Sequence, residues 1–249
     1  MSDASVDAGA ADAKRRQLEA LLRRRAEAAG PGATTESASQ SAGPRDAALS
    51  LGQERLYRVA AMDPGQPFYN VAVAYRLTGP LDTDALRRAV AAIAARHEIL
   101  RTTFPEVDGA PVQRIAPGTE TDEVIRETDL SGSDAAAVAQ AVAEELGRVI
   151  DLAHGPLWRL ALFREGPDSW LMTLVMHHIV SDGWTFELFL RDLARAYEAA
   201  QAGAPPASDN APAPQYVEFA DRQRREVERT SMEPLREAWA RRLDGPIPP

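Results

Sequence analysis

The segment LVMHHIVSDGWTFELF, residues 174–189, joins an apolar run to two adjacent histidines, an Asp-Gly step and a helix-like pattern. The run WLMTLVMHH, 170–178, is typical of a central strand that is covered on both faces. Neighbouring residues of a strand point to opposite faces, so His177 and His178 cannot share one role. We expect one of them to face the core or a structural partner, and the other to face a cleft.

An imidazole at the end of a strand is well placed for proton transfer. In open α/β sheets, functional groups commonly lie where strands end. There an imidazole can accept a proton from an attacking amine or alcohol, or hold that nucleophile for attack. Asp182 could orient a histidine or pair with an arginine, and Gly183 allows a turn and a close approach of the backbone to a ligand.

The residues of this segment leave other interpretations open. Adjacent histidines also occur as ordinary packing in a protein core. Metal binding is disfavoured, because adjacent histidines suit one ion poorly and no Cys or Glu ligand stands beside them. A nucleophile at Ser181 would lack the Gly-x-Ser-x-Gly elbow. The chain has no cysteine, which excludes disulfides and thiolate ligands. We therefore expect no metal site.

Outward from this segment, strand and helix patterns alternate along the chain. The periodicities predict strands at 69–77, 111–115, 158–165 and 170–178, and helices at 50–60, 83–98, 133–150 and 185–200. Asp82 or Thr83 can cap the helix 83–98. His97 recurs on the apolar face of that helix, so we expect it to serve packing. The alternation indicates an α/β layered domain.

The two ends of the chain differ in composition from this middle part. Residues 1–46 contain an Arg-rich amphipathic helix at 13–28 and a Gly/Ser/Pro-rich linker, which together form a possible docking element. The globular part is expected over 47–200. Residues 201–249 begin as a Pro/Ala linker, and a charged helix is predicted at 215–243.

Composition limits the class of function. The chain has 249 residues, 45% hydrophobic side chains and a formal net charge of −9. The negative charge argues against nucleic acid, which usually requires a basic patch. No run approaches the roughly 18 apolar residues of a membrane span, and the N-terminus has no apolar signal core. We therefore expect a cytoplasmic protein without a membrane or nucleic-acid partner.

The segment MHHIVSDGW, 176–184, resembles the core motif of the condensation domains of nonribosomal peptide synthetases. Three further segments resemble other motifs of that family in the right order: LSLGQERLY at 49–57, RHEILRTTF at 96–104 and YVEFADRQ at 216–223. The resemblance covers about 47–243. It implies a chloramphenicol acetyltransferase-like layered sheet with flanking helices, as one lobe of a two-lobed condensation domain.

The resemblance also implies roles for single residues. His178 would face the tunnel between the lobes and position the acceptor amine or take its proton, and Gly183 would donate its backbone N–H to the thioester oxygen. His177 and Asp182 would be structural, with Arg101 as the ion-pair partner of Asp182. No cofactor would be bound directly, because the substrates are carried on the phosphopantetheine of peptidyl carrier protein domains.

The implied activity is amide-bond formation between carrier-bound aminoacyl or peptidyl thioesters. An epimerisation domain shares the histidine motif and remains an alternative. The chain resembles only the first lobe, so we expect it to be weak or inactive without the second lobe or neighbouring synthetase modules. Two other functions stay open: a non-catalytic module that docks a carrier protein, and a standalone acyltransferase acting on a small amine or alcohol.

Overall fold

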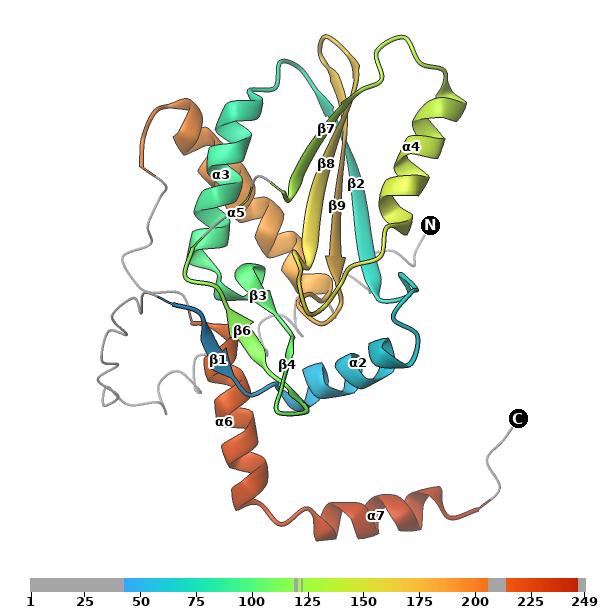
Figure 1. The fold of residues 1–249 in the computed structure, drawn as a ribbon, viewed down its shortest axis with the longest axis vertical. Coiled ribbons are helices and arrows are strands. Elements are labelled where there is room, and N and C mark those ends of the chain that lie inside the picture. The colour runs from blue at the N-terminus through green and yellow to red at the C-terminus, as the bar shows by residue number, and fades with distance from the viewer. Residues whose placement is uncertain (1–42, 119–120, 122, 206–213, 246–249) are drawn as a thin grey trace, which may run out of the picture. The chain divides into compact units, whose positions relative to one another are not determined.

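A computed structural model describes residues 43–118, 121, 123–205 and 214–245. Its centre is a four-stranded sheet in the order β2-β9-β8-β7. β2 (Asn70–Thr78), β9 (Ser169–His177) and β8 (Trp158–Gly166) are antiparallel neighbours, and β7 (Ile125–Asp129) runs parallel to β8. Helices α3 (Thr83–Arg96) and α5 (Gly183–Gln201) cover one face, and α4 (Ala135–Gly147) lies on the other (Figure 1).

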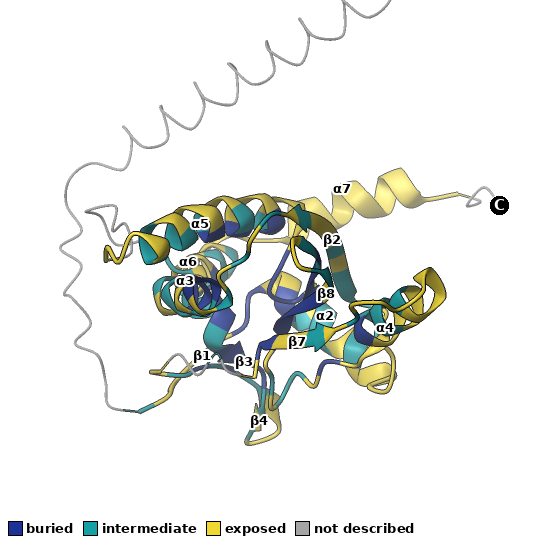
Figure 2. Ribbon diagram, turned by 90° about the horizontal axis from the view of Figure 1, so that it is seen from above, coloured by how far each residue is buried: buried dark blue, intermediate teal, exposed yellow. Residues whose placement is uncertain are grey.

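Strand β9 is buried on both faces, as its unbroken apolar run predicts. Met172, Leu174 and Met176 belong to the core on the α3/α5 face, and Val175 belongs to a second core on the opposite face. Buried residues, in dark blue, are also seen in the neighbouring strand β8 (Figure 2). The predicted α/β layered class is therefore confirmed, and the central strand delivers the two histidines at its end.

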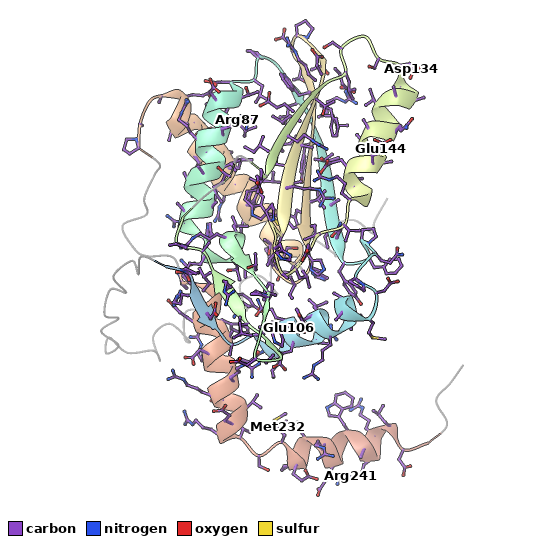
Figure 3. The ribbon with its side chains drawn as sticks, viewed as in Figure 1. Arg87, Glu106, Asp134, Glu144, Met232 and Arg241 are labelled. Atoms are coloured by element: carbon purple, nitrogen blue, oxygen red, sulfur yellow. The ribbon has the colours of Figure 1, made fainter. Side chains whose placement is uncertain are left out.

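Side-chain caps fix where the helices begin. Asp82 accepts a hydrogen bond from the N–H of Ala85 and starts α3, and Asp134 caps α4 in the same way (Figure 3). Ser50 and Gln53 form a capping box at the start of α2 (Leu51–Met62). Each cap satisfies backbone donors that have no partner inside the helix.

A smaller sheet lies beside α2. It has the order β1-β6-β3 and consists of Arg45–Ala47, Gln113–Ile115 and Thr102–Thr103. A short hairpin, β4 (Glu106–Val107) and β5 (Ala110–Pro111), precedes β6, and a 3₁₀ turn (Glu98–Arg101) precedes β3. β1 pairs with β6, so the folded part includes residues upstream of the expected boundary at 47. The predicted helix 13–28 lies outside the described residues.

Several predicted elements differ from the structure. The helix expected at 83–98 ends at Arg96, and β1, β3, β4 and β7 were not predicted because they are short or lack a regular alternation. The helix expected at 215–243 is two helices, α6 (Tyr216–Arg229) and α7 (Glu233–Leu243), with Met232 between them (Figure 3). Pro234 occupies the first turn of α7, where its ring prevents continuation of a preceding helix. No helix within the described ranges is long and apolar enough to cross a bilayer.

Candidate active site around His178

His178 follows directly after β9, and its side chain is exposed. Its backbone N–H donates to the carbonyl of Tyr69 at 2.8 Å, which holds it to the start of the neighbouring strand. Its Nδ1 lies 2.6 Å from the carbonyl oxygen of Ser181. Because a carbonyl oxygen only accepts, Nδ1 carries a proton, so the ring nitrogen that can accept a proton is Nε2. His178 is thus arranged as a proton acceptor.

The loop that follows His178 is held by its own hydrogen bonds. The hydroxyl of Ser181 donates to the carbonyl of His177 at 3.1 Å, and Val180 N–H donates to the same carbonyl at 3.0 Å. Ser181 is buried and its hydroxyl is engaged, which disfavours it as a nucleophile. The loop therefore positions His178 and does not itself supply a reactive group.

His178 lines a cavity of about 380 Å³ between α2, α3, α5 and the start of α6. The walls are mainly apolar: Leu56, Ile93, Ile99, Leu100, Ile179, Val180, Leu188 and Phe189. The α5 side of the cavity carries Thr185, Leu188 and Asp192, which recur at helical spacing on one face. An apolar cavity with few polar groups is the usual form of a small-molecule site.

His177 lies on the other face of the sheet. It is 5% exposed and borders a separate cavity with Tyr57, Phe104 and Ile150. The N–H of Ile179 donates to its Nδ1 at 3.1 Å, so the ring is neutral. Burial, together with the nearby His178, lowers the pKa of His177 to about 4. The prediction that the two histidines face opposite sides is confirmed.

The lowered pKa of His177 makes folding stability depend on pH. Unfolded chains protonate histidine near pH 6.5, whereas the folded protein resists protonation down to about pH 4. Between these two pH values the unfolded state therefore binds more protons than the folded state. The contribution of His177 to the free energy of unfolding is complete above about pH 6.5 and is lost as the pH falls towards 4.

We expect His177→Asn to flatten the pH dependence of the free energy of unfolding between pH 6.5 and 4. Asparagine can still accept from the N–H of Ile179 but does not titrate. Urea unfolding of the wild type and of the variant at several pH values measures the slope. An unchanged slope in His177→Asn would contradict the assignment.

The predicted ion pair between Arg101 and Asp182 is wrong. Arg101 donates from Nη1 to the carbonyl of Ala116, and its Nη2 lies 3.7 Å from the carboxylate of Glu98. The Asp182 carboxylate instead accepts from the N–H and the hydroxyl of Thr185, at 2.9 and 2.8 Å. Asp182 is the N-cap of α5. Its position just before a helical pattern was the signal for this role.

Two substitutions distinguish a cap from an ion pair at position 182. Asp182→Ala should lower the free energy of unfolding by about 0.5–2 kcal/mol, whereas Asp182→Asn should stay close to the wild type because asparagine caps equally well. Denaturant midpoints measure both. If asparagine costs as much as alanine, the carboxylate charge has a partner and the cap is not its main role.

Gly183 is the first residue of α5, and its backbone N–H is among the donors that a helix leaves unpaired at its start. A Cβ built on it would meet no atom within 4 Å. Its φ is one that any residue adopts. The space beside this N–H is open because no atom lies within reach of the missing side chain. A ligand oxygen could therefore approach it.

Two residues in the same cavity were not predicted as functional. His97 Nε2 lies 3.3 Å from Asp192 Oδ2, and both side chains border the cavity of His178. His97 caps the end of α3 and does not pack on its apolar face as expected. The only sequence signal was its place in RHEILRTTF, since Asp192 lies 95 residues further along the chain.

The segments 49–57 and 216–223 contact each other and form one wall of the cavity. The hydroxyls of Ser50 and Tyr216 are 2.9 Å apart, and the N–H of Leu51 donates to Gln223 Oε1 at 2.9 Å. Arg224 donates to the carbonyl of Leu49. Helix α6 thereby holds the start of α2, which contributes Gly52, Gln53 and Leu56 to the cavity.

A family model described as the condensation domain matches residues 44–249. The chain belongs to the condensation-domain family. This family explains why the histidine segment and its three companion segments occur together in one chain, and it confirms the resemblance to the condensation domains of peptide synthetases.

Among the residues that the structure describes, no group of three or more His, Cys, Asp or Glu could hold a metal ion.

The relatives of this condensation-domain chain are much longer than it is. It is 36% identical to the phosphinothricin tripeptide synthetase PhsC of Streptomyces viridochromogenes over 252 residues, which is 100% of this chain and 23% of that protein. It is 39% identical to a linear gramicidin synthase of Brevibacillus parabrevis over 224 residues, 88% of this chain and 3% of that protein.

Solved condensation-domain structures share the fold. The X-domain in its complex with OxyB from teicoplanin biosynthesis superposes with a TM-score of 0.72 at 30% identity, over 82% of this chain and 44% of that one. The first condensation domain of the calcium-dependent antibiotic synthetase, with substrate analogue 3a, gives a TM-score of 0.70 at 24% identity, over 82% and 50%. The chain thus spans about half of each matched structure.

Proposed function

We propose that this chain forms amide bonds between aminoacyl or peptidyl thioesters, as the N-terminal half of a condensation domain. The observation that carries the proposal is the hydrogen bond from His178 Nδ1 to the Ser181 carbonyl at the border of a largely apolar cavity, which leaves Nε2 as the proton acceptor. The thioesters would be carried on the phosphopantetheine arms of peptidyl carrier protein domains, so the chain itself would bind no cofactor.

The proposed step balances without any further reactant. The acceptor amine attacks the thioester carbonyl, a C–N bond forms, and the C–S bond breaks. His178 Nε2 takes the proton of the attacking amine and returns it to the departing thiolate. The N–H of Gly183 donates to the carbonyl oxygen while negative charge develops there. Asp182 and Thr185 hold the helix start that carries this donor.

The test supplies the chain with an aminoacyl donor and an aminoacyl acceptor on separate carrier proteins, together with a polypeptide carrying the second half of a condensation domain. Mass spectrometry of the acceptor carrier should then show a dipeptidyl species. The chain alone should form it weakly or not at all, because one lobe offers only one wall of the tunnel. Absence of product with the second half present would defeat the proposal.

Three parts of the chain have different roles in this reaction. Residues 47–200 form the N-terminal lobe, and 201–249 lead towards a second lobe. Residues 1–46 serve as a docking element for a partner. The amphipathic pattern of 13–28 and the composition of 30–46 support this assignment. Neighbouring synthetase modules would supply the carrier domains.

A non-catalytic binding role is the second candidate. The matched X-domain structure is a complex with another protein, OxyB, at 30% identity to this chain. Deleting residues 1–30 should abolish binding of a carrier protein if this chain acts as a docking module, and calorimetry would measure it. Unchanged affinity after the deletion, together with a His178-dependent product, would favour the catalytic role.

A further inference from the structure

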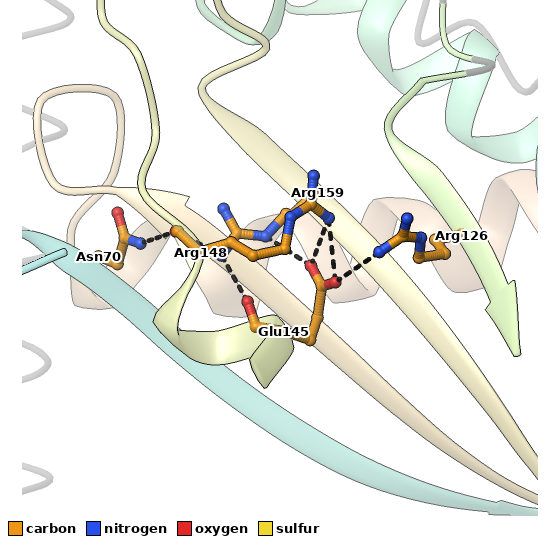
Figure 4. A network of polar contacts seen from close by, with 5 residues as sticks. All are labelled: Asn70, Arg126, Glu145, Arg148 and Arg159. Carbon is orange, nitrogen blue, oxygen red and sulfur yellow. Dashed lines mark hydrogen bonds and ion pairs between the residues drawn. The ribbon is translucent and has the colours of Figure 1, made fainter. Parts of the chain in front are cut away.

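A cluster of three arginines surrounds one carboxylate on the α4 face of the sheet (Figure 4). Glu145 Oε1 lies 2.5 Å from Arg159 Nε, and Glu145 Oε2 lies 3.0 Å from Arg148 Nη1 and 3.9 Å from Arg126 Nη1. Ile125, Trp158 and Leu160 belong to the core of the α3/α5 face. Their neighbours Arg126 and Arg159 therefore lie on the opposite face.

The cluster carries more positive than negative charge. One carboxylate faces three guanidinium groups, in a protein with a formal net charge of −9. Arg159 is buried and donates from Nε to Glu145 Oε1 and from Nη2 to the backbone carbonyls of Glu145 and Arg148. The excess charge therefore resides on Arg126 and Arg148, whose side chains are 63% and 51% exposed.

Both of these exposed arginines have N–H donors that make no hydrogen bond to a described residue. Within the described residues, Arg126 makes no hydrogen bond, and its contact with Glu145 is an ion pair at 3.9 Å. Arg148 uses only Nη1. Both guanidinium groups approach the same oxygen of Glu145, so they lie close enough for one small anion to touch both.

The geometry points to a binding site for a phosphate monoester dianion on Arg126 and Arg148. The planar forks of two arginines match the oxygens of a tetrahedral phosphate, and their charges match its two negative charges. Glu145, which Arg159 fixes from below, holds both cations near one point. Arg159 also occupies the carbonyls at the end of α4, which would otherwise repel an anion.

A small anion fits this site better than an acidic macromolecule. Only two guanidinium groups are available, and the remaining surface of a protein with net charge −9 would repel an extended acidic partner. The phosphate could be free inorganic phosphate or the 3′-phosphate of a coenzyme A molecule, which share the same dianionic chemistry. This site lies apart from the His178 cavity, so the inference does not depend on the proposed amide-forming reaction.

Calorimetric titration of the whole chain with inorganic phosphate tests the site. We expect saturable binding that weakens about tenfold in Arg126→Gln and in Arg148→Gln, because each loses a charge-assisted hydrogen bond. Arg87→Gln is the matched control, since Arg87 is a partly exposed arginine paired with Glu127 elsewhere on the surface. Arg126→Lys should bind with intermediate affinity, because it keeps the charge and loses the fork.

Coenzyme A and dephospho-coenzyme A distinguish the two sources of phosphate. Coenzyme A binding more tightly than inorganic phosphate, and about tenfold more tightly than its dephospho form, assigns the site to the nucleotide. Equal affinity for coenzyme A and inorganic phosphate assigns it to free phosphate. The inference is overturned if phosphate binding does not saturate, or if the Arg126 and Arg148 variants, with unfolding midpoints of the wild type, bind like Arg87→Gln.

Discussion

Replacing His178 by alanine should lower the rate of amide formation by two to four orders of magnitude, the usual contribution of a positioned proton acceptor. The expected loss follows from one contact. The hydrogen bond from Nδ1 to the Ser181 carbonyl leaves Nε2 as the acceptor at the cavity. The rate would be measured as dipeptide formed on the acceptor carrier in the presence of the second half of the domain.

His178→Asn separates proton acceptance from loop structure. Its side-chain amide can still donate to the Ser181 carbonyl near the place of Nδ1, but it has no atom in place of Nε2. We expect it to be as inactive as alanine and as stable as the wild type. His154→Asn, on an exposed histidine outside the cavity, should keep full activity. If His178→Asn keeps most of the rate, Nε2 is not the proton acceptor.

Replacing Glu145 by leucine should lower the free energy of unfolding by about 3–5 kcal/mol, because it leaves a buried guanidinium without its counter-ion. Glu145 is 4% exposed and Arg159 is 7% exposed. Burial lowers the pKa of Arg159, although the hydrogen bond and the negative charge of Glu145 act to raise it. Chemical denaturation would measure the loss.

Glu144→Leu is the matched control on the same helix turn, since Glu144 is exposed and accepts a hydrogen bond from Gln140. A surface change of this kind should stay within about 0.5 kcal/mol. The double variant Glu145→Leu, Arg159→Leu should recover much of the loss, because it removes both buried charges together. Equal effects of Glu144→Leu and Glu145→Leu would show that the buried pair contributes little.

The local pattern of the chain was enough to predict the strand, the loop and the helix around His178. Strand β9 was recognised because its side chains are apolar on both faces, and α5 because an N-cap residue precedes a helical period. The prediction for residues 215–243 was less accurate, since the charged pattern continues across residues 230–232 although the backbone does not. Short strands such as β7 were not predicted, because five residues are too few to show a regular alternation.

The sequence by itself determined the class of fold, the family, the opposite orientation of the two histidines and the segment that bears the proposed chemistry. Only the tertiary structure decided which groups meet: Asp182 with Thr185 and not with Arg101, His97 with Asp192, and three arginines with Glu145. The reason is the separation along the chain over which each kind of interaction acts. Periodicity and caps act over a few residues of backbone, whereas the long-range pairs depend on how packed helices and strands place side chains from distant parts of the chain.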